Sequence, residues 1–316
     1  MIEVNNLVKR YGNHTAVDHL SFKIEKGKIY GFLGPNGAGK STTMNMITGY
    51  IASTEGTVKI DGHDILEEPE AAKKCIGYLP EQPPVYFDMT VLEYMKFVAD
   101  LKKIPKDKKA NMIEEVMDMV KISDMRNRLI KNLSKGYRQR VGLAEAIMGY
   151  PEVIILDEPT VGLDPKQIIE IRTLIKELKK KHTVILSSHI LTEIAATCDR
   201  LVVLSSGHLA ADSTLEELLK SAGSQAGMLL QADASAEKLM GIVRAIGGVL
   251  DCRAETDEAG RTQIRIYTQD GADIHRELFV ALSKADCPIR SLRPAEVSLE
   301  DVFLQLTHDS RYKTEE

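Results

Sequence analysis

The sequence predicts an α/β protein with a large, mainly parallel sheet domain followed by a smaller α+β domain. Apolar runs such as residues 153–156 (VIIL) and 183–188 (TVILSS) alternate with helical patterns, as in doubly wound parallel sheets. Near the N-terminus, residues 2–8 and 15–24 alternate apolar and polar side chains, which indicates antiparallel strands. From residue 228 onward we expect the order β-α-β-β-α-β, the split ferredoxin-like pattern. A chain of 316 residues is long enough for both domains.

The first domain is expected to span residues 1–220, with a helical subdomain at about 88–150. Tyr11 and Gly12 fall in the turn between its first two strands. A lysine-rich connection at 102–109 separates two helical patterns. The remaining expected elements, in chain order, are strands at 57–61 and 75–82, a helix after Ser134, a strand at 153–156, a helix opened by Asp164 and Pro165, a strand at 183–188, a helix at 190–197 and a strand at 200–207.

The second domain is expected at residues 228–316, after a small, polar linker at 221–227 (SAGSQAG). Ser213 and Glu216 form a capping-box pattern that predicts the start of the last helix before this linker. The expected elements of the second domain are strands at 228–232, 248–256, 261–268 and 287–292, helices at 235–246 and 272–284, a turn at 257–260 and a terminal helix capped by Ser298.

Composition excludes several classes of protein. The net charge of −5 gives no basic footprint for nucleic acid, so no nucleic-acid partner is expected. The four cysteines are scattered without metal-ligand spacing and are expected to be reduced thiols of a cytosolic protein. The N-terminus lacks the apolar core of a signal peptide, and no run approaches the length needed to span a bilayer. If the protein works at a membrane, another chain must cross it.

A glycine-rich loop between a strand and a helix is the strongest functional signal. Its spacing is G-x-x-x-x-G-K-S, formed by Gly34, Pro35, Asn36, Gly37, Ala38, Gly39, Lys40, Ser41 and, next in the chain, Thr42. Glycines let backbone N–H groups point inward, and the helix N-terminus adds positive potential, so this loop is expected to cradle phosphates. Lys40 can reach the β- and γ-phosphates, and the Ser41 hydroxyl can bind Mg²⁺.

Two acidic residues, Asp157 and Glu158, leave the buried strand at 153–156. The carboxyl ends of parallel strands are where ligands bind in such sheets. We expect Asp157 to hold Mg²⁺, directly or through water, and Glu158 to deprotonate the attacking water. The alternative is an acidic turn without a chemical role.

A second helix N-terminus, at Ser134, Lys135 and Gly136, offers another anion site. Taken alone, a capped surface helix would be the preferred interpretation of these residues. Together, the motifs resemble the ATP-binding cassette family over about residues 2–220. GPNGAGKS is similar to its Walker A loop, LSKGYRQ to its signature LSGGQ with Lys135 in place of a glycine, and VIILDEP to Walker B.

The resemblance assigns further residues. It implies that His189 is the switch histidine, Gln82 belongs to the Q-loop and is a metal ligand with Ser41 and Asp157, and VGLD, ending at Asp164, is the D-loop. Tyr11 is implied to stack on adenine. From the residues alone, His189 could be a structural histidine, and Tyr11 could be a packed hairpin aromatic.

The family reading also implies partners and a mechanism. Two cassettes bind ATP and Mg²⁺ head to tail, each phosphate loop facing the partner's Ser134–Gly136, so the second copy is this chain or a paralogous cassette. Glu158, His189 and Lys40 are the implied catalytic residues of an ATPase. A separately encoded permease is expected to dock near Gln82–Met89 and to hold the cassette at the cytoplasmic face of the membrane.

The resemblance is strongest to exporters, and within them to gliding-motility-type cassettes. The second domain is expected to be regulatory or to support dimerisation. Two other classes stay open: a soluble cassette ATPase that acts on ribosomes or DNA, and a binding protein with an inactive site. The transported substrate and the direction of transport, beyond a preference for export, are not encoded in these motifs.

Overall fold

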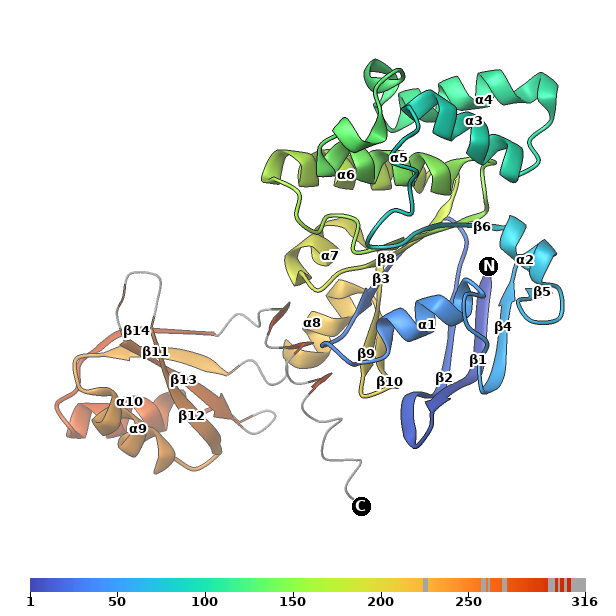
Figure 1. Cartoon of the computed structure of the whole chain (residues 1–316). Coiled ribbons are helices and arrows are strands. Elements are labelled where there is room, and N and C mark those ends of the chain that lie inside the picture. The colour runs from blue at the N-terminus through green and yellow to red at the C-terminus, as the bar shows by residue number, and fades with distance from the viewer. Residues whose placement is uncertain are drawn as a thin grey trace. The chain divides into compact units, whose positions relative to one another are not determined.

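The computed structural model describes residues 1–223, 227–256, 260, 262–268, 272–294, 299–300, 302–303 and 306–307 (Figure 1). The chain divides into two compact units. One runs from Met1 to Leu215 and also holds the described residues Leu306 and Thr307, and the other runs from Glu216 to Leu304.

The first unit is built on a six-stranded sheet that is parallel except at one edge. Its strand order is β10-β9-β3-β8-β7-β6, and only β10 runs antiparallel to its neighbour. The strands are β3 (Ile29–Leu33), β6 (Ile76–Leu79), β7 (Val153–Asp157), β8 (Thr183–Ser187), β9 (Arg200–Ser205) and β10 (His208–Ser213). The central strands β3, β7 and β8 are almost entirely buried, as their continuous apolar sequences predict.

A second, antiparallel sheet has the order β2-β1-β4-β5. Its strands are β1 (Ile2–Tyr11), β2 (His14–Ile24), β4 (Glu55–Ile60) and β5 (His63–Asp64). The apolar faces of the two sheets and helix α1 (Lys40–Ile47) share one core. Within it, the rings of Phe22 and Phe32 meet edge to face with centroids 5.4 Å apart, which joins β2 to β3.

Helices complete the first unit (Figure 1). They are α2 (Pro69–Lys74), α3 (Val91–Leu101), α4 (Lys106–Met119), α5 (Lys135–Ile147), α6 (Pro165–Leu178), α7 (Leu191–Thr197) and the 3₁₀ turns η1 (Ser123–Met125) and η2 (Ile130–Asn132). Helices α3, α4 and α5 pack together as a helical part of the first unit, and the subdomain bounds of about 88–150 stay a prediction.

In the described part of the second unit, which begins within α8, a four-stranded antiparallel sheet has two helices packed on it. Its elements are β11 (Met228–Ala232), α9 (Ala236–Arg244), β12 (Val249–Thr256), β13 (Thr262–Thr268), α10 (His275–Lys284) and β14 (Ile289–Pro294). The element order β-α-β-β-α-β and the sheet order β12-β13-β11-β14 confirm the ferredoxin-like prediction.

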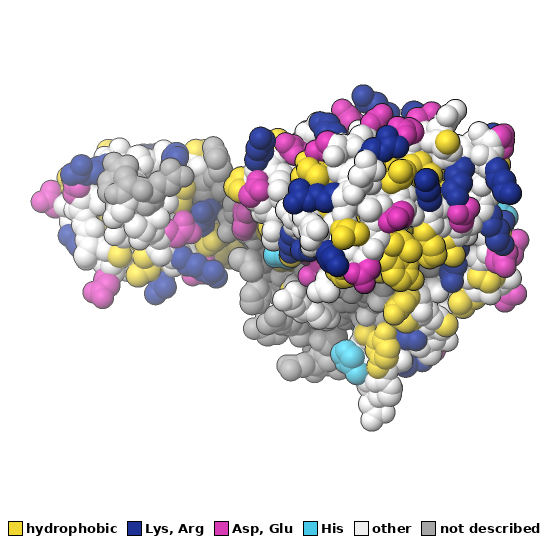
Figure 2. Space-filling view, turned by 45° about the horizontal axis from the view of Figure 1, so that its top comes forward, with side chains coloured by type: hydrophobic (Ala, Val, Ile, Leu, Met, Phe, Trp, Pro, Cys, Tyr) yellow, Lys and Arg dark blue, Asp and Glu magenta, His cyan; other side chains and the backbone are white. Residues whose placement is uncertain are grey.

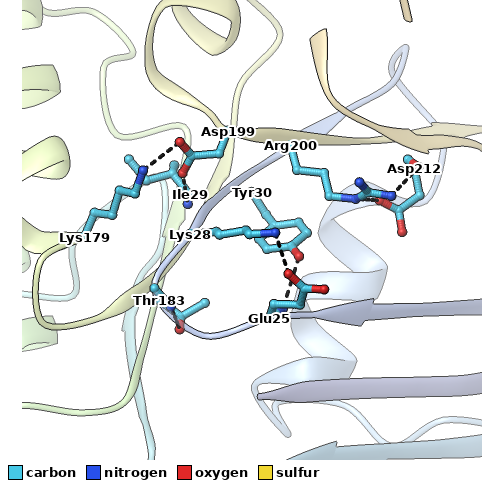
Figure 3. A network of polar contacts seen from close by, with 10 residues as sticks. Glu25, Lys28, Ile29, Tyr30, Lys179, Thr183, Asp199, Arg200 and Asp212 are labelled. Carbon is cyan, nitrogen blue, oxygen red and sulfur yellow. Dashed lines mark hydrogen bonds and ion pairs between the residues drawn. The ribbon is translucent and has the colours of Figure 1, made fainter. Parts of the chain in front are cut away.

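The start of β3 is fixed by a polar network that Figure 3 shows. The backbone N–H of Ile29 donates to Asp199 Oδ2 at 2.8 Å, and Lys179 pairs with the other oxygen of Asp199 at 2.7 Å. Just before the strand, Glu25 N–H donates to the Tyr30 hydroxyl at 3.1 Å. These bonds satisfy the backbone where β3 enters the core, so the far end of β3, which leads into the glycine-rich loop, is held in register.

Several local predictions were wrong. Tyr11 ends β1 instead of lying in the turn, and its register partner is His14. Helix α4 begins at Lys106, so the second half of the lysine-rich connection is helical, and Pro105 occupies the N-cap position. Strand β10 was not predicted, because its burial is intermediate throughout and its apolar pattern is weak.

The boundary between the units also differs in detail. Ser213 belongs to β10, and among the described residues its hydroxyl has no hydrogen-bond partner, so it does not cap α8 (Leu215–Gly223). Because α8 extends to Gly223, the first three residues of the predicted linker are helical. The rest of the linker falls largely outside the described residues, as do most of the turn at 257–260 and the cap at Ser298.

Candidate active site

The glycine-rich loop connects the end of β3 at Leu33 to α1, which begins at Lys40. Gly39 occupies the N-cap position with φ of 97°, in the left-handed region. A Cβ at Gly39 would lie 2.7 Å from the carbonyl oxygen of Ala16 in β2. Both the positive φ and the close approach of Ala16 therefore require glycine at position 39. Helix α1 presents its N-terminus to the space beside the loop.

Lys40 places its ammonium inside this loop. Its Nζ donates to the carbonyl oxygens of Gly34 at 2.6 Å and Pro35 at 3.1 Å. Burial lowers the pKa of Lys40, while the nearby carboxylates of Glu158 and Asp157 act in the opposite direction. An anion in the loop would be a better partner for this cation than two neutral carbonyls.

A cavity of about 360 Å³ lies beside the loop. Its lining residues are Tyr11, His14, Ala16 and the consecutive residues Asn36–Thr42. Tyr11 is 51% exposed, and Lys9 Nζ lies 5.2 Å from the centroid of its ring. Sequence reasoning missed His14 and Ala16, although the register of a β1–β2 hairpin would have placed His14 opposite Tyr11.

The two acidic residues lie at the carboxyl end of β7, and Ser187 of β8 fixes both. The Ser187 hydroxyl donates to Asp157 Oδ1 at 2.5 Å and accepts from the Glu158 backbone N–H at 3.0 Å. Glu158 has φ of 47°, an uncommon conformation for a residue with a side chain. Ser187 was not predicted as a site residue. The feature that could have identified it is its position on the neighbouring strand, where it is paired with Asp157.

His189 contacts Glu158 directly. Its Nδ1 lies 2.9 Å from Glu158 Oε2, and the Glu158 side chain is only 14% exposed. Burial raises the pKa of Glu158, while His189 acts to lower it. The structure thus groups Lys40, Asp157, Glu158 and His189, and it places a carboxylate with a raised pKa next to an imidazole.

The side chains at this site could bind Mg²⁺ together with an oxygen-rich ligand such as a phosphate. Ser41 in the first turn of α1 and Asp157 at the end of β7 offer oxygen atoms, which this ion prefers. The described part of the chain contains no group of three or more His, Cys, Asp or Glu residues able to hold a metal by themselves. A magnesium ion here would therefore share its coordination with phosphate oxygens and water.

The second predicted anion site, at Ser134–Gly136, and the predicted D-loop residue Asp164 do not line the cavity beside the glycine-rich loop. Ser134 caps α5 by accepting from Tyr137 N–H at 3.4 Å, and Asp164 caps α6 by accepting from Gln167 N–H at 3.0 Å. Gly136 and Asp164 both line a different cavity, of about 530 Å³. Its other lining residues are Asp118, Lys121, Ser123, Asp124, Tyr137, Arg140, Lys166, Gln167 and Glu170.

Comparisons with known proteins agree with this geometry. A family profile described as "ABC transporter" matches residues 17–161. The bacitracin transport ATP-binding protein BcrA of Bacillus licheniformis is 39% identical over 222 residues, which cover 70% of this chain and 72% of that protein. The daunorubicin/doxorubicin resistance ATP-binding protein DrrA of Streptomyces peucetius is 33% identical over 311 residues, covering 97% and 92%. The chain belongs to the ABC transporter ATP-binding family.

Solved cassettes have the same fold. The structure of an ATP-binding subunit of an ABC transporter matches with a TM-score of 0.65 and 28% identity, over 71% of this chain and 93% of that one. The dimeric, post-hydrolysis structure of the cassette MJ0796 bound to ADP and Pi matches with a TM-score of 0.62 and 26% identity, over 68% and 99%. The cassette described here is accordingly an ATP-binding ATPase of the α/β P-loop class.

The similarity to DrrA covers 97% of the cassette chain and so extends into the second unit. The resemblance to gliding-motility-type cassettes, in contrast, stays a prediction. In the described residues, no helix is both long enough and apolar enough to cross a membrane.

The segment after β6 exposes aromatic side chains. Leu79 of β6 is paired with Leu156 of β7, so the chain leaves the sheet beside Asp157 and continues through Gln82. Further along, Tyr86 and Phe87 are 55% and 51% exposed. The Tyr86 ring meets Phe97 of α3 edge to face at 5.3 Å. Figure 2 looks toward the helical part of the cassette and shows hydrophobic side chains exposed among charged ones.

Proposed function

We propose that this chain hydrolyses ATP to drive a separately encoded membrane permease, and that the pair works as an exporter. The observation that carries the proposal is the separation of two half-sites. Lys40 and the glycine-rich loop lie at one cavity, and Gly136 with Asp164 lies at another. Two copies arranged head to tail would bring each phosphate loop to the other copy's Ser134–Gly136, as a two-fold interface allows.

The chain's own groups would divide the chemistry as follows. The loop N–H groups and Lys40 bind the phosphates, and Tyr11 offers its exposed ring to the base. Glu158 accepts the proton of the attacking water, and His189 orients the Glu158 carboxylate through the 2.9 Å contact and donates to the terminal phosphate. Mg²⁺, held by Ser41, Gln82 and Asp157, would neutralise phosphate charge.

The dimer would open and close with the nucleotide. ATP would link the two copies, because its phosphates accept from the glycine-rich loop of one copy and from the N-terminus of α5 in the other, and loss of the terminal phosphate removes that link. The exposed aromatic segment within Gln82–Met89 is the proposed docking surface for the permease, since exposed apolar patches mark interaction sites. The proposed boundaries are a cassette domain at residues 1–220 and an accessory domain at 228–316.

The relatives' names support an exporter. BcrA is named for bacitracin transport, DrrA for daunorubicin and doxorubicin resistance, and LnrL of Bacillus subtilis, 30% identical over 97% of this chain, for linearmycin resistance.

The deciding experiment has two parts. In purified protein, Glu158→Gln should retain ATP, lose turnover and accumulate as a dimer; hydrolysis at the wild-type rate would refute the assignment of Glu158 as the base. In cells, a tagged Glu158→Gln chain should co-purify with a multi-span membrane protein. Recovery in ribosomal fractions without such a partner would favour a soluble ATPase instead.

A further inference from the structure

A buried hydrogen bond joins Thr160 to Glu193. Thr160 Oγ1 donates to Glu193 Oε2 at 2.5 Å. Thr160 is 5% exposed and Glu193 is 7% exposed. Among the described residues, neither side chain has another hydrogen-bond partner, so each depends on the other for its polar contact.

This bond and the contact between Glu158 and His189 join the same two segments of the chain. Both connect the segment after β7 to the segment after β8, and they are only two residues apart on the first segment. The segment after β7 is therefore tied at two points, one at Glu158, the proposed general base, and one at Thr160, within the turn that precedes Asp164. Thr160 O also accepts from Leu163 N–H at 3.2 Å, so the side-chain bond holds the turn as well.

Glu193 lies on a helix that is packed tightly against the sheet. Glu193 belongs to α7, and its neighbour Ile194 is fully buried. A Cβ at Gly31 in β3 would lie 2.7 Å from Ile194 Cγ2, so α7 packs against this strand as closely as glycine permits. Strand β3 leads into the glycine-rich loop and so positions Lys40. Glu193 belongs to α7, the helix that packs against this strand.

The Thr160–Glu193 pair is not an efficient way to stabilise the folded state. Burying a carboxylate costs free energy that a single hydrogen bond recovers only in part, whereas two apolar side chains of similar volume would pack without this cost. A polar pair at this position has value if it fixes one arrangement of the loop relative to α7.

We propose that Glu193 is a positioning residue for ATP hydrolysis. By holding Thr160, it keeps the segment from Glu158 to Asp164 in the arrangement that aligns Glu158 with His189 and presents Asp164 to the second copy. The inference rests on the proposed role of Glu158 as the base. Neither Thr160 nor Glu193 would contact ATP.

The test compares apolar, conservative and combined substitutions in the full chain. Thr160→Val and Glu193→Leu remove the bond, and Thr160→Ser and Glu193→Gln retain a donor and an acceptor. The double variant Thr160→Val/Glu193→Leu replaces both polar groups by apolar ones. For each variant, kcat and KM for MgATP and the thermal unfolding midpoint are measured.

We expect each apolar single variant to lower kcat about tenfold, with KM changed less than about twofold, because phosphate binding by the loop is untouched. The conservative variants should keep most of kcat. The double variant should recover the unfolding midpoint but not kcat. If the double variant recovers both, the pair is merely structural and the proposal is wrong; this comparison stands even if a single variant does not fold.

The outcome separates this inference from the proposed function. Wild-type turnover by Glu158→Gln would remove the assigned base. Wild-type kcat in Thr160→Val, together with loss of turnover in Glu158→Gln, would reject the role of Glu193 and leave the base assignment intact.

Discussion

His189 Nδ1 lies 2.9 Å from Glu158 Oε2, at the end of a sheet where Lys40 and Asp157 also converge. The contact joins a side chain that is 58% exposed to one that is 14% exposed. A largely buried carboxylate next to an exposed imidazole is suited to accept a proton on one side and to respond to a bound phosphate on the other. The ionisation of Glu158 is therefore the first property to test.

The pH dependence of hydrolysis should reflect the raised pKa of Glu158. Burial raises this pKa, so the proton leaves Glu158 at a higher pH than from an exposed glutamate. Since the base must be deprotonated, activity falls as pH drops through the raised pKa. His189→Ala removes an interaction that lowers the pKa, so the acid limb of the kcat/KM profile should move to still higher pH. An unchanged limb in His189→Ala would contradict the coupling.

Ser187→Ala should reduce turnover more than it reduces binding. The hydroxyl contacts both Asp157 and the Glu158 backbone, and its loss leaves the N–H of the strained Glu158 with only its 3.3 Å bond to the Ser187 carbonyl oxygen. We expect kcat to fall about tenfold, equivalent to about 1.4 kcal/mol, with ATP affinity nearly unchanged. Ser205→Ala is a matched control, since Ser205 is also buried at the carboxyl end of a strand of the same sheet. Equal effects in both variants would argue against a specific role for Ser187.

Much of this site follows from sequence, and the remainder depends on pairing between strands. The loop from Gly34 to Ser41 and the two acids at the carboxyl end of β7 have local signatures, because phosphate cradles and strand-end carboxylates need fixed residue types at fixed spacing. Ser187 and His14 act through neighbours on other strands, and only the register of those strands brings them to the site. The same holds for Thr160 and Glu193, which are 33 residues apart in the sequence.

The fold shows the same limit. Long apolar strands and helices such as β7 and α6 were predicted near their true ends, since burial on both faces or on one stripe leaves a clear pattern. Strand β10 was missed because it is an edge strand of intermediate burial whose partner is set by tertiary structure.

Gly39→Ala should destabilise the cassette more than a substitution at another left-handed glycine. Gly39 combines φ of 97° with a position where a Cβ would lie 2.7 Å from Ala16 O. Gly12 has φ of 60° and open space around it, so Gly12→Ala measures backbone strain alone. We expect about 1 kcal/mol of lost unfolding free energy for Gly12→Ala and about 2 kcal/mol or more for Gly39→Ala, measured by urea denaturation. Equal losses would mean that the loop can move away from β2 at little cost.

Tyr11 should contribute to ATP affinity through its ring and not through its hydroxyl. The ring lines the cavity beside the glycine-rich loop, and Lys9 Nζ lies 5.2 Å from its centroid. An aromatic platform for a nucleotide base adds about 1 kcal/mol, so Tyr11→Ala should raise the Kd for ATP about five- to tenfold, whereas Tyr11→Phe should leave it nearly unchanged. Tyr50→Ala is the control, because Tyr50 is 80% exposed and is not among the residues that line this cavity. A Kd that rises as much in Tyr11→Phe as in Tyr11→Ala would show that the hydroxyl is the binding group. An unchanged Kd in both variants would mean that the base binds away from β1, and the assignment of Tyr11 would then be wrong.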